Sequence, residues 1–173
     1  MSRLILMRHS RAERPPGLLD HQRPLASSGR ADAAIAAARL GPHISGGPFV
    51  VLVSSAERTR QTWAEICAAL PPASVLEESA LYEATPRELL DLASMVGKAD
   101  SAGSLLVIGH NPTIHAAALQ VLNGRLDRDS ELARRFPTSA FAVIDIPDWD
   151  TLTSTVGTLA TFEIPRVGKD ASS

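Results

Sequence analysis

Histidine and arginine side chains stand where several short apolar runs of this sequence end. Arg8 and His9 follow the first run, and His110 follows a later one. Arg58 comes shortly after a third run, at the start of an expected helix. A neutral imidazole can attack an electrophile, and guanidinium groups match phosphate oxygens with paired hydrogen bonds. Each feature alone is commonly a surface pair or a turn, but together they favour phosphoryl transfer with His9 as the nucleophile.

The expected sheet explains how these residues would meet. In an open α/β sheet, ligands bind beyond the carboxyl ends of the strands. The helix that begins near Arg58 would add backbone N–H donors and a dipole that favours an anion. Phosphoryl transfer needs mainly positioning and neutralisation of charge. Arg8, Arg58 and His110 would supply both, so we expect neither a metal ion nor a cofactor.

The composition is that of an ordinary globular protein. Of the 173 residues, 45% are apolar and 21% charged, which predicts one domain over residues 1–173 with a frayed tail from about residue 167. A net charge of −2 gives no general attraction, so neither nucleic acid nor a membrane is expected as a partner. The single cysteine, Cys67, excludes an internal disulfide. We find no signal-peptide pattern and no run of membrane-spanning length, so a cytoplasmic location is expected.

Apolar and helical patterns alternate along the chain and predict the order of the elements. Strands are expected over residues 3–7, 49–53, 75–76, 104–109, 139–146 and 153–163. Helices are expected over residues 29–40, 57–70, 87–96 and 113–122, with Ser54 or Ser55 capping the second and Pro86 opening the third. This order predicts an α/β fold, a three-layer α/β/α sandwich with a mostly parallel central sheet and helices on both faces. The last two strands lack a helix between them, so at least one of them is expected to run antiparallel.

The segments that carry the candidate residues resemble one family. The motifs of the histidine phosphatase superfamily, with its phosphoglycerate mutase-like fold, resemble residues 4–9 with Ala12, residues 54–62 and residues 107–112. The SixA-like phosphohistidine phosphatase branch is similar in residues 20–25, Gly29 and residues 136–138. The resemblance runs from residue 3 to about residue 152, which is most of the chain.

The resemblance implies a role for each motif residue. His9 matches the nucleophile that becomes phosphorylated, and Arg8 and Arg58 match the two phosphate-binding arginines. His110 matches the histidine that hydrogen-bonds the transferring phosphoryl group. The family needs no metal. Ser10 replaces the glycine that usually follows the nucleophile, and we expect it to be tolerated and to touch phosphate through its hydroxyl, unless the position demands a positive φ.

The motifs assign neither the general acid nor the residues around the site as directly. Glu83 is the candidate that would protonate the leaving group, and the alternative is a solvated loop carboxylate. Asp20 and Arg23 are expected to pair and to shape the loop beside the site. His21 is a candidate for the rim of the site. His115 is either a neighbour of the site or a surface residue.

These interpretations predict a metal-independent phosphatase with a phosphohistidine intermediate. The short chain leaves few residues for a lid, which favours phosphohistidine on a partner protein as the substrate. The alternative within enzymes is a phosphatase of small phosphomonoesters such as sugar or nucleotide phosphates. A mutase is less expected, because it must exclude water. A non-catalytic phosphate-binding module would not need His9 and His110. The sequence leaves the oligomeric state open.

Overall fold

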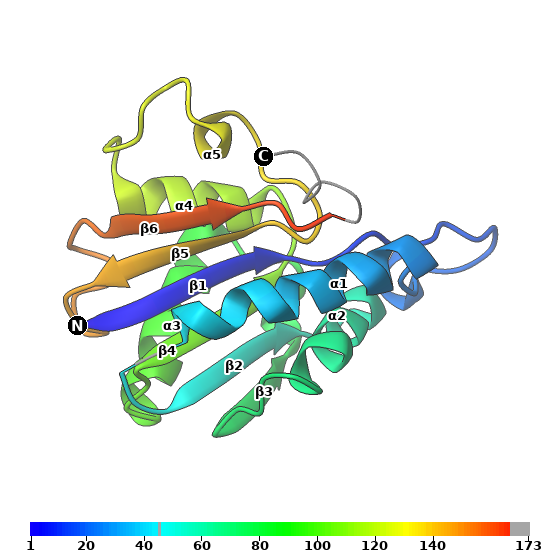
Figure 1. Ribbon diagram of the computed structural model, residues 1–173, viewed down its shortest axis with the longest axis horizontal. Coiled ribbons are helices and arrows are strands. Elements are labelled where there is room, and N and C mark those ends of the chain that lie inside the picture. Colours follow the sequence, from blue (N-terminus) through cyan, green and yellow to red (C-terminus); the bar gives the residue numbers. More distant parts are fainter. Residues whose placement is uncertain (45, 167–173) are drawn as a thin grey trace.

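The computed structural model describes residues 1–44 and 46–166, so the tail from residue 167 that we expected to fray lies outside the described residues. Within the described ranges, six strands form one sheet in the order β3-β2-β4-β1-β5-β6 (Figure 1). They are β1 (Ser2–Arg8), β2 (Phe49–Ser54), β3 (Ser74–Glu78), β4 (Ser104–Gly109), β5 (Phe141–Ile146) and β6 (Thr158–Glu163). Strands β1 to β4 pair in parallel, β5 runs antiparallel to β1, and β6 runs antiparallel to β5. The mostly parallel sheet with a late antiparallel strand is confirmed.

Helices cover both faces of this sheet. The helices are α1 (Ser27–Leu40), α2 (Glu57–Cys67), α3 (Pro86–Ala99), α4 (Thr113–Leu122) and the short α5 (Glu131–Arg134). Short 3-10 helices lie at η1 (Asp20–Gln22), η2 (Gly41–His43) and η3 (Ser79–Tyr82). Helices α1 and α2 lie on one face and α3 and α4 on the other, so the three-layer sandwich is confirmed (Figure 1). The four-residue α5 was not expected, because it is too short to show a helical period.

Two hydrophobic cores result from the alternation of side chains along the strands. In β1, Leu4 and Leu6 contribute to the core beneath α3 and α4, whereas Ile5 and Met7 contribute to the core beneath α1 and α2. All four side chains are fully buried. Burial of each such side chain contributes about 1.5–3 kcal/mol. This continuous apolar run therefore fixes β1 in the middle of the sheet, and Arg8 and His9 at its carboxyl end.

Some element boundaries differ from the expected ones. The second helix ends at Cys67 rather than at residue 70. Strand β5 begins at Phe141 rather than at residue 139, because Ser139 has a φ of 65°, which is incompatible with an extended strand. Strand β6 begins at Thr158, since a turn anchored by Asp148, whose side chain accepts from the backbone N–H of Thr151, occupies the preceding chain.

The loop between β1 and α1 is held by its own backbone. Ala12 and Leu25 form an isolated antiparallel bridge, and Ala26 N donates to Arg11 O at 2.9 Å. Gly29, in the first turn of α1, allows this approach, because a Cβ atom there would lie 2.1 Å from Arg11 O. The loop therefore returns alongside the start of α1 in a fixed position.

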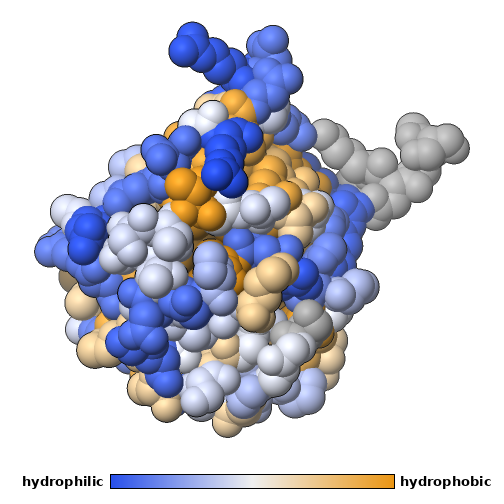
Figure 2. All heavy atoms as spheres, turned by 90° about the vertical axis from the view of Figure 1, so that its left-hand side faces the viewer, coloured by the Kyte–Doolittle hydropathy of each residue, from blue (hydrophilic) through white to orange (hydrophobic). Residues whose placement is uncertain are grey.

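The described residues contain no helix that is long and apolar enough to cross a membrane. Figure 2 shows the side of the molecule where β1 begins, and hydrophilic residues occupy most of its rim with apolar residues between them.

Candidate active site

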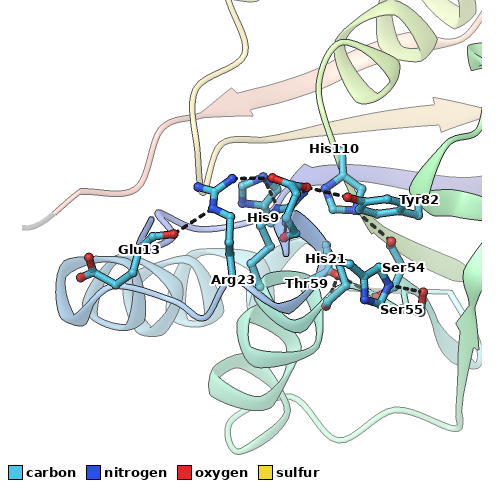
Figure 3. A network of polar contacts seen from close by, with 12 residues as sticks. His9, Glu13, His21, Arg23, Ser54, Ser55, Thr59, Tyr82 and His110 are labelled. Carbon is cyan, nitrogen blue, oxygen red and sulfur yellow. Dashed lines mark hydrogen bonds and ion pairs between the residues drawn. The ribbon is translucent and has the colours of Figure 1, made fainter. Parts of the chain in front are cut away.

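Strands β1, β4 and β2 are neighbours, so their carboxyl ends bring the candidate residues together. His9 follows β1, His110 follows β4, and Ser54 is the last residue of β2. The ring centroids of His9 and His110 are 5.3 Å apart (Figure 3). Arg58, in the first turn of α2, reaches the same point, since its Nε donates to His9 Nε2 at 3.3 Å. The structure thus gathers Arg8, His9, Arg58 and His110 at one edge of the sheet.

His9 is buried and its two ring nitrogens have different partners. Nδ1 lies 2.7 Å from the carbonyl oxygen of Ser10, which can only accept, so we infer that Nδ1 carries the proton. Nε2 then carries the lone pair, beside Arg58. The pKa of His9 is lowered to about 3, mainly by burial; the hydrogen bond to Ser10 O opposes this shift, and the nearby His110, Arg58 and Arg8 add to it. At neutral pH, His9 is therefore a neutral imidazole held in one tautomer, as a nucleophile requires.

His110 is oriented by the neighbouring strand. Its Nε2 lies 2.9 Å from Ser54 Oγ, and its Nδ1 is buried without a partner. Burial lowers the pKa of His110 to about 4, with a smaller contribution from Arg58. If Ser54 donates to Nε2, the neutral ring presents an Nδ1–H donor to the site. Ser54 was expected as a possible helix cap, but the N-cap of α2 is Ala56 without a side-chain cap, so neither Ser54 nor Ser55 has that role.

The two arginines of the site differ in how their donors are used. Arg58 has a partner at each nitrogen, with Nη1 on Asp20 O at 2.7 Å and Nη2 on Asp20 Oδ2 at 3.0 Å. Arg8 donates from Nη1 to Phe136 O at 3.1 Å, whereas its Nε is buried without a partner. Burial lowers the pKa of Arg8, and the charge of Arg58 adds to this. Arg8 Nε is therefore an unused donor close to the nucleophile, and His110 Nδ1 is a second one in the tautomer in which Ser54 donates to Nε2.

Asp20 connects the loop to the site. The expected pair with Arg23 is confirmed at 2.8 Å, but Asp20 also accepts from Arg58 and, at 2.5 Å, from the hydroxyl of Tyr82. The hydrogen bond from Tyr82, followed by those from Arg23 and Arg58, holds the pKa of the Asp20 carboxyl well below its usual range. Asp20 therefore stays ionised and anchors Arg58.

Tyr82 was missed by the sequence analysis. Its ring packs edge-on against His110, with centroids 5.4 Å apart, and lies 5.8 Å from the guanidinium carbon of Arg58. The expected rim residue His21 also packs against the ring of Tyr82, with centroids 4.8 Å apart, and bonds Ser55 Oγ at 2.9 Å (Figure 3). No pattern in the sequence indicated a role for Tyr82, apart from its position next to the candidate Glu83.

Comparison with known proteins places this geometry in a family. Models of known protein families gave no match. An uncharacterised protein of Mycobacterium tuberculosis is 36% identical over 167 residues, which are 92% of this chain and 100% of that protein. A solved protein from Nakamurella multipartitia, provisionally assigned as the phosphohistidine phosphatase SixA, is 32% identical with a TM-score of 0.80, over 95% of this chain and 96% of that one.

A second solved structure is the protein histidine phosphatase SixA in complex with tungstate. It is 28% identical, with a TM-score of 0.71, over 94% of this chain and 97% of that one. The chain belongs to the SixA-like branch of the histidine phosphatase superfamily. In this histidine phosphatase, the three motifs that suggested the family are the segments that meet at the carboxyl ends of β1, β2 and β4.

Ser10 and Glu83 were also expected at the active site of this histidine phosphatase, but their side chains have different surroundings from those that we expected. Ser10 is fully buried, and its hydroxyl accepts from Ser139 Oγ at 2.7 Å, which does not support the expected contact with phosphate. Its φ is not positive, so the serine is tolerated without strain. Glu83 is exposed and lines a separate depression beside η3, so the structure does not bring it to His9. His115 bonds Leu132 O at 2.7 Å and packs against Phe136, whose carbonyl accepts from Arg8, so it is a neighbour of the site rather than part of the pocket lining.

The site opens into a pocket of about 650 Å³. Arg8, His9 and Arg58 form its base, and the loop before α1 and the start of α1 form its wall. Glu13 also lines the pocket, but its side chain is exposed and its carboxylate points away from His9 (Figure 3). Among the described residues, no group of three or more His, Cys, Asp or Glu is arranged to hold a metal ion.

Proposed function

We propose that this protein is a phosphatase that forms a phosphohistidine intermediate on His9. The observation that carries the proposal is the fixed tautomer of His9, with Nδ1 bonded to Ser10 O and Nε2 beside Arg58. The unused donors Arg8 Nε and His110 Nδ1 lie at the same edge of the sheet and would bind phosphoryl oxygens. Tungstate in the related SixA structure is an oxyanion of phosphate-like charge and shape, which supports an oxyanion site here.

The reaction has two displacements. Nε2 of His9 attacks phosphorus, and the bond from phosphorus to the leaving group breaks with its electron pair going to the leaving atom. Water then attacks the phosphorus, the P–Nε2 bond breaks, and inorganic phosphate leaves with His9 neutral again. Arg8, Arg58 and His110 stabilise the charge on the phosphoryl oxygens in both steps. We propose that no metal ion is required, so a chelator would leave the rate unchanged.

The surroundings of His9 favour phosphohistidine on a protein as the substrate. Asp20 stays ionised because it accepts hydrogen bonds from Tyr82, Arg23 and Arg58. The carboxylate of Glu13 points away from His9, and Glu83 lies in a separate depression. Among the described residues, none of these three carboxyl groups is therefore in position to protonate a leaving oxygen. The leaving nitrogen of a phosphoramidate can take its proton from water, so such a substrate suits this site. Phosphomonoesters of sugars or nucleotides are the alternative substrates.

Rates on a phosphohistidine protein and on a panel of small phosphomonoesters, measured side by side, test the substrate. The His9→Ala variant should lose all turnover and should not retain acid-labile radiolabelled phosphate, whereas the wild-type protein should trap it. Full activity of His9→Ala would overturn the mechanism. Tight phosphate binding without turnover of any substrate would favour a binding module instead.

Arg58→Ala and His110→Ala should each lose about 3–4 kcal/mol of transition-state stabilisation, as expected for a lost electrostatic donor. The comparison is made through kcat/KM on the best substrate. His43→Ala is the matched control, because His43 bonds Glu163 and lies beside Arg3 at the start of β1, and this variant should keep wild-type kcat/KM.

A further inference from the structure

The pocket above His9 carries more positive charge than one phosphoryl group needs. Among the described residues, the arginines that line it are Arg8, Arg11, Arg14, Arg23 and Arg58. Glu13 is the acidic residue of the lining, and Asp20 beside it pairs with two of the arginines. The whole chain has a net charge of −2, so this excess is local to the pocket. A cleft lined by one sign of charge concentrates and steers ligands of the opposite sign.

Two of these arginines have no protein partner. Arg23 and Arg58 share Asp20, and Arg8 bonds Phe136 O at the base of the pocket. In the described part of the chain, the side chains of Arg11 and Arg14 are exposed, and their guanidinium groups make neither a hydrogen bond nor an ion pair. Each guanidinium has about five N–H donors, and these are therefore free to bind a ligand at the wall of the pocket.

The backbone that carries these two side chains is fixed. Ala26 N donates to Arg11 O at 2.9 Å, and Glu13 N donates to Pro24 O at 2.8 Å. The start of α1 closes the same wall, and its N-cap residue, Ala26, offers no side-chain acceptor to the first N–H groups of the helix. The wall is thus positioned in advance, which lowers the entropic cost of binding an anion there.

The pocket is also larger than a phosphate ion alone would fill. Pockets of about 300–1,000 Å³ hold ligands of drug size, and this one measures about 650 Å³. We propose that Arg11 and Arg14 form an outer anion subsite, which binds a second anionic group of the substrate whose phosphoryl group His9 attacks. The second group is a phosphate or carboxylate of a small substrate, or acidic side chains next to the phosphohistidine of a protein. This inference rests on the proposed function for the position of the reacting phosphoryl group.

Binding to the inactive His9→Ala variant tests the subsite without turnover. One pair of probes is fructose 1,6-bisphosphate and fructose 6-phosphate, and the other is two phosphohistidine peptides with either two Glu or two Gln beside the phosphohistidine. Titration calorimetry should give about tenfold tighter binding for the more anionic member of at least one pair. The pair that shows the preference identifies the source of the second anion.

The added substitutions Arg11→Gln and Arg14→Gln should bring that ratio of Kd values close to one. The matched control is Arg125→Gln with Arg128→Gln, which removes the same charge from exposed positions outside the pocket. Equal affinities within both pairs, or a preference that survives the Arg11 and Arg14 substitutions, would overturn the proposal. The wild-type protein is assayed on all four probes, so that a preference in binding without any turnover would refute the proposed phosphatase but leave the subsite standing.

Discussion

The two histidines of the site differ in which ring nitrogen forms a hydrogen bond with the rest of the protein. His9 is held through Nδ1 by a main-chain carbonyl, which leaves Nε2 with its lone pair. His110 is held through Nε2 by Ser54, which leaves Nδ1 without a partner. Burial lowers the pKa of each ring to about 3 and about 4, respectively, so both are neutral at pH 7. One ring can therefore attack phosphorus while the other donates to it.

Ser54→Ala is expected to lower kcat about tenfold or more, with a smaller change in KM. The substitution leaves His110 Nε2 buried without its hydrogen bond, which costs about 1–3 kcal/mol and no longer selects the tautomer that donates from Nδ1. Steady-state kinetics gives kcat and KM, and ¹⁵N NMR of the histidine rings reports the tautomer. Ser55→Ala is the control, because Ser55 bonds His21 at the rim. Equal kcat values for the two variants would contradict the role of Ser54.

At the scale of elements, the site depends on close contact between the loop after β1 and the first turn of α1. Arg11 O lies only 2.1 Å from the place that a Cβ atom on residue 29 would take, and Gly29 leaves that space open. The same loop places Asp20 against Arg58 and Arg11 in the pocket wall. A change in the packing of the loop on α1 is therefore transmitted to the site without any change of a site residue.

Gly29→Ala should lower the free energy of unfolding by about 1–3 kcal/mol, the usual cost of forcing extra atoms into a packed place. The new Cβ atom would lie 2.1 Å from Arg11 O and 2.9 Å from Arg11 N, which are backbone atoms that cannot rotate away. Denaturant unfolding measures the loss. Gly41→Ala is the control, because its Cβ would meet Leu70 Cδ2 at an ordinary 3.6 Å and its backbone is helical. Equal stability of the two variants would contradict the tight approach.

At the scale of the whole molecule, burial of two neutral histidines links folding to pH. The pKa of His9 is about 3 and that of His110 about 4 in the folded protein, below the ordinary value of 6.5 that the unfolded chain restores. Between pH 4 and pH 6.5 the unfolded chain binds protons that the folded chain does not. The free energy of unfolding therefore rises with pH across this window, and the contribution of the two histidines is lost as pH falls.

His9→Gln should flatten this dependence. It removes one of the two protons, so the slope of unfolding free energy against pH should fall by at most about 1.4 kcal/mol per pH unit between pH 4 and 6.5. Above pH 7.5 the two proteins should show parallel curves. Urea unfolding at several pH values measures the slopes. Parallel curves across the acidic window would contradict the low pKa of His9.

Local patterns in the sequence were enough to predict the main strands and helices, and four residues that meet at the site: Arg8, His9, Arg58 and His110. Continuous apolar runs make buried strands wherever they occur, and a chemical group directly after such a run must lie at a strand end, as His9 and His110 do. The parallel order of strands and helices then brings those ends to one edge. These inferences rely on local patterns, which is why the fold class and the pairing of Asp20 with Arg23 could be predicted.

The contacts between atoms of the site depend on how distant elements pack. Tyr82 and Asp20 are 62 residues apart, and their hydrogen bond depends on how η3 and the loop after β1 pack against the same sheet edge. Tertiary packing also places Ser54 within hydrogen-bond distance of His110 and buries the hydroxyl of Ser10 against Ser139. It leaves Glu83 exposed, in a separate depression. Hydrogen-bond partners depend on the positions of distant elements to within fractions of an ångström, and no local pattern of residues specifies those positions.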